Sequence, residues 1–266
     1  MRRQYPAEFL FQVVALIVAI IVVHALYVAV VRPKADAIFA EQAASMAADP
    51  EYVPQRSAWV IIRDFEQEAC FVLMLWAFAI MGSKGVLLRR EHRLLDEDLV
   101  RVASGTRILP DDAREYSREI EALPEADRRM LLPRTLLSAL HRFTATRNIQ
   151  DVSDTASGVC DAESERLESE LSMVRYIAWA IPSIGFIGTV RGIGEALGQA
   201  HKAVEGDIAG VTRSLGVAFN STFIALLISI FLMFLLHRLQ LQQERLVLET
   251  ETYVDRHLIR HLQVPS

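Results

Sequence analysis

Two long apolar stretches of the chain predict membrane-spanning helices. Phe9 to Val31 and Ser214 to Leu236 each run for about 23 residues without a charge, and a helix needs about 20 apolar residues to cross a bilayer. The first stretch is longer than the apolar part of a signal peptide, so we expect it to remain as an anchor. Its histidine, His24, is expected to pack against a neighbouring helix, with a proton relay as the alternative.

Two shorter apolar stretches lie between these. Ala69 to Ser83 covers about 15 residues, and the long side chain of Lys84 can reach the interface and extend this span to about 20. Tyr176 to Val190 is the third stretch, which Arg191 interrupts. The pattern therefore predicts four transmembrane helices.

The positions of Lys and Arg predict the orientation. Arginines are frequent between Lys84 and Arg175 and again after His237, and segments of this kind tend to stay in the cytoplasm. Arg2 and Arg3 place the N-terminus on the same side, so both termini are expected to be cytoplasmic. We expect an all-α integral membrane protein with a cytoplasmic N-terminus (1–8), a first span (9–31), an extracytoplasmic loop (32–59), a second span (60–88), a cytoplasmic helical region (89–175), a third span (176–200), an extracytoplasmic loop (201–213), a fourth span (214–237) and a cytoplasmic helical tail (238–266).

The polar segments also follow a helical pattern. One helix is expected to stop at Gly105 and another to start at Pro110, with acidic residues in its first turn. The polar run DVSDTASG (151–158) predicts a linker, after which one long helix enters the third span. The tail repeats an apolar residue every seven positions, which indicates packing on a partner helix. These positions are Leu239, Leu246 and Tyr253.

Composition agrees with a membrane protein and narrows the function. Hydrophobic residues make up 52 % of the 266 residues, and the mean hydropathy is +0.24. The net charge of -5 comes from mixed acids and bases without the basic patch that nucleic-acid binding requires. Cys70 and Cys160 lack metal-type spacing, and His257 and His261 have no evident third ligand. With no phosphate loop or nucleophile elbow either, we expect neither an enzyme nor a cofactor.

The stretch IPSIGFIGTVRGIGEAL (181–197) places glycines and charges in the third span. Gly185, Gly188 and Gly192 recur at steps of three and four on one helix face, which lets another backbone approach closely. Gly194 and Gly198 repeat the four-residue step. Glycines 192, 194 and 198 lack the spacing and the preceding strand of a dinucleotide fingerprint.

The charges and the proline of this span carry further expectations. Arg191 and Glu195 would be costly in lipid, so we expect them to face protein, water or headgroups. They lie four residues apart and are candidates for an ion pair. Pro182 is expected to kink the helix or to loosen its hydrogen bonding.

Polar side chains also occur within the last two spans. Asn220, Ser221 and Thr222 form a cluster in an otherwise apolar stretch, Ser229 lies two turns beyond Thr222 on the same face, and Thr189 lies in the third span. Such side chains can flank an aqueous path for an ion. The alternative is that they hydrogen-bond to helix carbonyls or across helices.

At these residues the sequence resembles the MotA/TolQ/ExbB proton-channel superfamily. The stretch PSIGFIGTVRGI (182–193) looks like the TolQ/ExbB form of the third-span motif, and LGVAFNSTFIALL (215–227) looks more like MotA. The span count of four is that of MotA, whereas TolQ and ExbB have three. The glutamate that ExbB carries just before the threonine of its last span is absent here.

The resemblance implies a homopentamer around two transmembrane helices from a dimer of a single-span ExbD/TolR/MotB-like partner. The partner's aspartate would bind the transported H+ or Na+, and the assembly would act as a rotary motor of the bacterial inner membrane. By position, Thr189 and Thr222 would be pore-facing hydroxyls, and Pro182 would shape the pore-lining helix. Asn220, Ser221 and Ser229 would lie on the same ion pathway.

Two hypotheses remain open at this point. The chain is an ion-channel subunit that couples ion flow to mechanical work, or it is an oligomeric scaffold or signalling protein whose cytoplasmic helices bind partners. Polar-to-apolar substitutions at Thr189 and Thr222 would impair the first kind of protein and be tolerated by the second.

Overall fold

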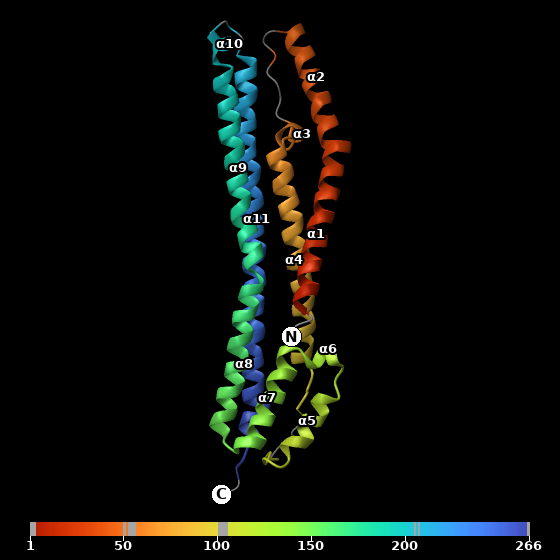
Figure 1. Cartoon of the computed structure of the whole chain (residues 1–266), viewed down its shortest axis with the longest axis vertical. Helices are drawn as coiled ribbons and strands as arrows, with labels where there is room; N and C mark the ends of the chain where they lie inside the picture. The colour runs from red at the N-terminus through yellow and green to blue at the C-terminus, as the bar shows by residue number, and fades with distance from the viewer. Residues whose placement is uncertain are drawn as a thin grey trace. The chain divides into compact units, whose positions relative to one another are not determined.

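The computed structural model describes residues 4–49, 52, 57–100, 106–204, 206 and 208–264 (Figure 1). Every regular element in these residues is helical, and one isolated parallel bridge joins Ile108 to Leu262. Four helical segments are long and apolar enough to cross a membrane: Glu8–Met46, Phe65–Leu95, Ile149–Gly198 and Ala209–His261. The predicted all-helical class with four apolar helices is therefore confirmed.

The chain forms two compact units. Unit 1 comprises Met1–Met81 and Met173–Leu236, and unit 2 comprises Gly82–Ser172 and His237–Ser266. Unit 1 contains most of the apolar stretches, and unit 2 contains most of the residues expected in the cytoplasm.

The first helix of unit 1 contains a π turn. It runs through α1 (Gln4–Leu26), η1 (Tyr27–Val31) and α2 (Arg32–Ala48). Its buried residues recur every four positions, a step that drifts by about 40° around an α-helix. The wider π turn offsets part of this drift and keeps one face toward apolar residues of α3 and α4. The buried residues are Ala19, Val23, Tyr27, Val31 and Ala35.

Within the extracytoplasmic segment expected over 32–59, the chain is helical as far as Ala48. Alanine has the highest helix propensity, and this segment is rich in it. Pro33 follows the π turn two residues after its last residue, Val31. Its ring lacks an N–H and clashes with the carbonyl four residues earlier, which accounts for the local widening of the helix.

The other helices of unit 1 are a short turn and two long helices. The short α3 (Ala58–Ile61) precedes α4 (Phe65–Leu95), whose first turn is acidic and thus favourable to the helix dipole. The helix α9 (Ser172–Gly198) is followed by α10 (Ala200–Val204) and α11 (Ala209–His257). As expected, α11 continues from the fourth span into the tail, over 49 residues.

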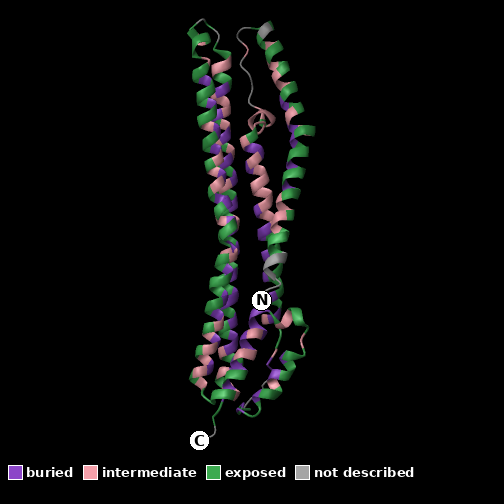
Figure 2. Ribbon diagram, viewed as in Figure 1, coloured by how far each residue is buried: buried purple, intermediate pink, exposed green. Residues whose placement is uncertain are grey.

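Unit 2 has a core of large apolar side chains. Leu136, Leu140 and Phe143 of α7 are fully buried in it, together with Val254 and Leu258 from the end of the chain. The seven-residue repeat of the tail is buried too, and buried and exposed positions alternate along the helix that contains it (Figure 2). The tail therefore packs on helices of its own chain. The remaining elements of this unit are α5 (Ala113–Glu121), α6 (Glu125–Arg128), α7 (Leu131–Thr146), α8 (Ile149–Glu170) and η2 (Ile259–His261).

Two sequence-based boundaries in this region are wrong. Residues 151–158, expected as a linker, lie inside α8. The break comes earlier, at Arg147 with a φ of 51°, and the Asn148 side chain caps α8 by accepting a hydrogen bond from Gln150 N at 2.9 Å. The helix expected to stop at Gly105 ends at Leu95. Gly105 itself, like Arg2 and Arg3, lies outside the described residues.

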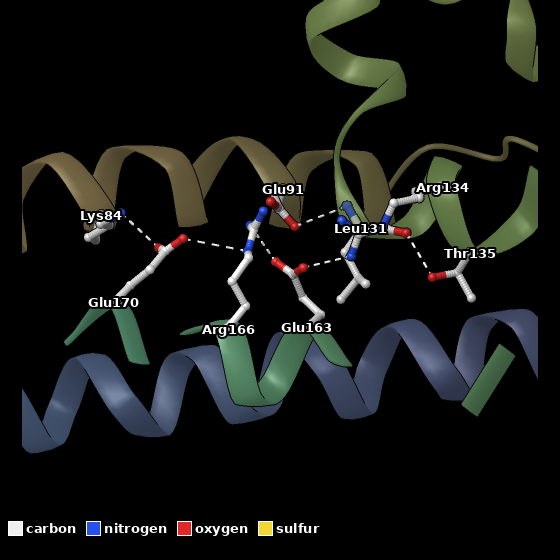
Figure 3. Close-up of polar contacts among 8 residues, drawn as sticks. All are labelled: Lys84, Glu91, Leu131, Arg134, Thr135, Glu163, Arg166 and Glu170. Carbon is white, nitrogen blue, oxygen red and sulfur yellow. Dashed lines mark hydrogen bonds and ion pairs between the residues drawn. The ribbon is translucent and has the colours of Figure 1, made fainter. Parts of the chain in front are cut away.

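A buried ion-pair network connects three helices of unit 2 (Figure 3). Glu163 of α8 is 2 % exposed and accepts hydrogen bonds from Arg134 of α7 and from Arg166, both at 2.6 Å. Arg166 also lies 3.5 Å from Glu170, which accepts a 2.7 Å hydrogen bond from Lys84 of α4. The network joins α4, α7 and α8 through alternating charges.

Near this network, the side chain of Glu91 of α4 caps the first turn of α7 (Figure 3). Its carboxylate accepts a hydrogen bond from Leu131 N, the first residue of α7, at 3.3 Å. No side chain of α7 or of its N-cap residue Met130 serves this end of the helix. Burial raises the pKa of Glu91, which lies outside the expected second span.

Candidate functional site

Three glycines of α9 let it contact α11 at backbone distance. A Cβ on Gly185 would lie 2.4 Å from the Cβ of Ala225, and one on Gly188 would lie 2.5 Å from the Cβ of Ser221. At Gly192 the conflict is with backbone, since Ala218 N would be 2.7 Å away. Any side chain here would force the two helices apart.

Gly194 and Gly198 share the spacing of these glycines but not their environment. Neither would bring a Cβ within 4 Å of another part of the chain. The close-packed stripe within the chain therefore ends at Gly192.

The close approach brings together the two threonines singled out in the sequence. The hydroxyls of Thr189 and Thr222 are in direct hydrogen-bond contact. Thr222 also contacts the carbonyl of Gly185 at 3.1 Å, and Thr189 contacts the carbonyl of Ala218 at 2.9 Å. If Thr189 donates to Thr222 and Thr222 donates to the carbonyl of Gly185, both hydroxyl protons are used. Lone pairs then remain on both oxygens.

Ser221 and Asn220 lie beside this pair with different partners. Ser221 is buried against Gly188 and donates to the carbonyl of Val217 at 2.8 Å. Asn220 is half-buried, and its side chain makes no hydrogen bond to the part of the chain that the structure describes. The amide thus remains available to a group from outside the chain.

Ser229 lies away from the threonines and serves the proline of α9. Pro182 has no N–H and cannot donate the usual helical hydrogen bond to the carbonyl of Ala178, four residues earlier. Ser229 of α11 donates a 3.1 Å hydrogen bond to this same carbonyl. Polar side chains of neighbouring helices commonly restore such bonds in membranes. The carbonyl that Pro182 leaves without a helical donor therefore ties α9 to α11.

Arg191 and Glu195 are paired in the structure, and a second carboxylate completes the group. Arg191 Nη1 lies 2.8 Å from Glu195 Oε1. Its Nε and Nη2 donate to the two oxygens of Glu66, at 2.7 and 2.8 Å, in a bidentate pair. Glu66 belongs to the first turn of α4, and its Cγ is the third contact that a Cβ on Gly188 would meet, at 3.0 Å.

Residues 128–252 match the model of the MotA/TolQ/ExbB proton channel family. The resemblance seen in the sequence is therefore confirmed for this part of the chain. The match covers just under half of the 266 residues and includes every site residue predicted from the sequence. Among curated proteins, none matches the chain.

Sequence reasoning missed Glu66, which lies outside the stretch that matches the MotA/TolQ/ExbB family. The available signal was the run RDFEQEAC, in which three acids directly precede an apolar stretch. In the structure a carboxylate from α4 thus contacts Arg191 of the hairpin that α9 and α11 form. Among the described residues, no group of three or more metal-ligating side chains is present in this hairpin or elsewhere.

Proposed function

We propose that this chain is the ion-channel subunit of an inner-membrane rotary motor. It works as a homopentamer around a dimer of a single-span, aspartate-bearing ExbD/TolR/MotB-like partner, and it carries H+ or Na+. The observation that carries the proposal is the contact between Thr189 and Thr222, which joins hydroxyls from both helices of the family hairpin.

The hydroxyl pair suits ion transfer for a chemical reason. Its oxygens retain lone pairs that can face a hydrated proton or a sodium ion, while the partner's aspartate supplies the negative charge. The chain itself then needs neither a carboxylate in the last span nor a cofactor. The arginine-rich segments favour cytoplasmic N- and C-termini in a bacterial inner membrane.

A scaffold or signalling role is the second candidate, and one observation favours it. Both threonine hydroxyls contact carbonyls within the hairpin, at 2.9 Å for Thr189 to Ala218 and 3.1 Å for Thr222 to Gly185. Hydrogen bonds of this kind occur where hydroxyls only join helices. The two proposals differ in whether the hydroxyls are needed after assembly.

Cryo-electron microscopy of the full chain, purified together with a co-expressed single-span protein from a neighbouring gene, tests the assembly. We expect five subunits around two helices, with Thr189 and Thr222 facing the partner's aspartate. A monomer, a dimer or a ring with a lipid-filled centre would instead support the scaffold.

Ion flux into liposomes that contain this complex tests the hydroxyls. Thr222→Val should lower flux under an imposed H+ or Na+ gradient by about tenfold or more, because one hydrogen bond to a charged species is lost. The matched control is Ser183→Ala, since Ser183 is an exposed hydroxyl in the same apolar region and donates to the carbonyl of Trp179. Unchanged flux in an assembled Thr222→Val complex would reject the motor proposal.

A further inference from the structure

A second polar site lies in unit 1, away from the hydroxyl pair. Glu68 of α4 is buried, with 10 % of its side chain exposed, and it faces two basic residues of the first helix. His24 Nδ1 lies 2.7 Å from Glu68 Oε1, and Arg32 Nη2 lies 2.5 Å from Oε2. Each carboxylate oxygen therefore has its own nitrogen partner.

The π turn builds this site. His24 precedes η1 and Arg32 follows it, and the turn allows side chains eight residues apart to reach one carboxylate. Turns of this type are frequent at functional sites. Tyr27, on the turn, is 2 % exposed, and its hydroxyl has no hydrogen-bond partner in the described part of the chain. A buried polar atom without a partner is rare in a purely structural cluster.

The geometry determines which nitrogen of His24 carries a proton. Arg32 pairs with Glu68 and keeps it a carboxylate, which can only accept hydrogen bonds. The nitrogen at 2.7 Å, Nδ1, must therefore be the donor. In a neutral histidine ring, the nitrogen that donates a hydrogen bond carries the proton. The other nitrogen is unprotonated and can act as a base. In this site the base is Nε2, on a side chain that is 58 % exposed.

We propose that His24, oriented by Glu68 and Arg32, is a proton-binding site in the first span. A proton from water forms an N–H bond at Nε2, and the imidazole becomes a cation that shares Glu68 with Arg32. The site then gains one positive charge next to α4. The proposal concerns residues outside the family match at 128–252, and it stands whether or not the hairpin conducts ions.

Other charged and titratable groups lie near this site. Tyr27 of η1 is within electrostatic reach of Glu68, Arg32, Asp64 and Cys70. Asp64, before α4, is in turn reached by Arg63, by Glu66 of α4, by Arg191 of α9 and by Arg213 of α11. Among these groups, Glu68 is the one that contacts His24 directly.

Nitrogen NMR of the full chain in lipid nanodiscs, with 15N-labelled histidine, tests the proposal. The chain has 7 histidines, and the signal lost in His24→Gln identifies the one of interest. We expect the neutral ring to carry its proton on Nδ1, and a lowered pH to add a second proton at Nε2. A neutral ring with its proton on Nε2, or a ring that stays neutral as the pH is lowered, would overturn the proposal.

A pair of substitutions separates the role of Glu68 from general effects of charge. In Glu68→Gln the His24 ring should lose its preference for the proton on Nδ1. In the matched control Glu41→Gln, which removes an exposed acid of α2, the spectrum should not change. An unchanged tautomer in a folded Glu68→Gln protein contradicts the proposal. If this variant does not fold, the tautomer and the titration of the unmodified protein decide the question by themselves.

Discussion

The two units differ in where their helices come closest and in which side chains they leave exposed. Between Gly185 and Gly192 of α9 the residues that meet α11 are small, although large side chains such as Ile181 and Leu232 are buried elsewhere in the same two helices. Buried and exposed positions alternate along both helices (Figure 2), and many of the exposed residues are large and apolar. In unit 2 large apolar side chains such as Leu140 and Phe143 fill the core, and the buried carboxylate of Glu163 is held by arginines. The small residues of the hairpin interior are Gly185, Gly188, Gly192, Ala218, Ser221 and Ala225.

This difference follows from the solvent that each unit is built for. In water, burial of large apolar side chains is the main source of stability. In lipid the surroundings are as apolar as the side chains, so helices associate through close backbone contact and hydrogen bonds. Most of the exposed large apolar side chains belong to unit 1, as a surface in contact with lipid requires. Substitutions that remove one kind of contact should affect only the unit that uses it.

The largest effect is expected from an emptied core position in unit 2. Phe143→Ala should lower the free energy of unfolding by about 3–5 kcal/mol, because it leaves a cavity among fully buried side chains. The same change in α11, Phe223→Ala, removes a side chain that is 55 % exposed and should cost far less. Thermal unfolding of both variants in the same detergent measures the difference. Equal losses would contradict the difference in burial between the two side chains.

A smaller loss is expected when the central carboxylate of the unit 2 network is neutralised. Glu163→Gln leaves the guanidinium groups of Arg134 and Arg166 without their shared partner (Figure 3). We expect a loss of about 2–3 kcal/mol, below the range for fully buried pairs because both arginines remain partly exposed. Glu165→Gln, two residues away on the exposed face of α8, is the control and should be nearly neutral. A thermal-unfolding series at several salt concentrations checks both values.

In the hairpin, an added methyl group should be harmful only where α9 contacts the backbone of α11. Gly192→Ala would place a Cβ 2.7 Å from backbone atoms of α11 and should destabilise unit 1 by about 1–3 kcal/mol. Gly194→Ala meets nothing within 4 Å in this chain and should be neutral to slightly stabilising for it. Cross-linking of cysteines introduced on α9 and α11 reports whether the helices have separated. A tolerated Gly192→Ala would contradict the backbone contact.

The smallest effect concerns the proline of α9. Ser229→Ala removes the donor to the Ala178 carbonyl and should cost about 1 kcal/mol. In a Pro182→Ala background residue 182 supplies its own N–H to that carbonyl, so the same substitution should cost less. A double-mutant cycle of thermal stabilities measures this coupling. Equal costs in both backgrounds would mean that Ser229 does not serve the proline.

Apolar periodicity and composition predicted the coarse fold, and local signals failed at particular boundaries. The polar run 151–158 has the composition of a linker, yet Val152 and Ala156 face the core of unit 2, and Asn148 provides the cap that moves the break upstream. The polar residues after the first span give no sign of a helix by apolar periodicity, yet the first helix extends to Ala48 through an alanine-rich segment. In both cases tertiary contacts or helix propensity outweighed the turn-forming character of single residues.

The residues of the candidate site could be named from their motifs, but their partners could not. Spacing placed Arg191 and Glu195 on one helix, and the structure pairs them. The same spacing grouped Ser229 with Thr222, whereas the structure bonds Ser229 to the carbonyl that Pro182 leaves free. Glu66 contacts the hairpin from a helix more than a hundred positions away in sequence, and helical periodicity carries no information about contacts at that separation.

The sequence by itself determined four apolar helices, an all-helical class and a family relationship, because each follows from residue type and local spacing. Only the tertiary structure decided which glycines contact another backbone and which carbonyl accepts the hydrogen bond of Ser229. It also decided which carboxylate pairs with Arg191 and which one pairs with His24. Those outcomes depend on which faces of distant helices meet. Which faces come into contact is set by the packing of the whole helix surface and by the need to pair every buried charge. No single stretch of the chain contains that information.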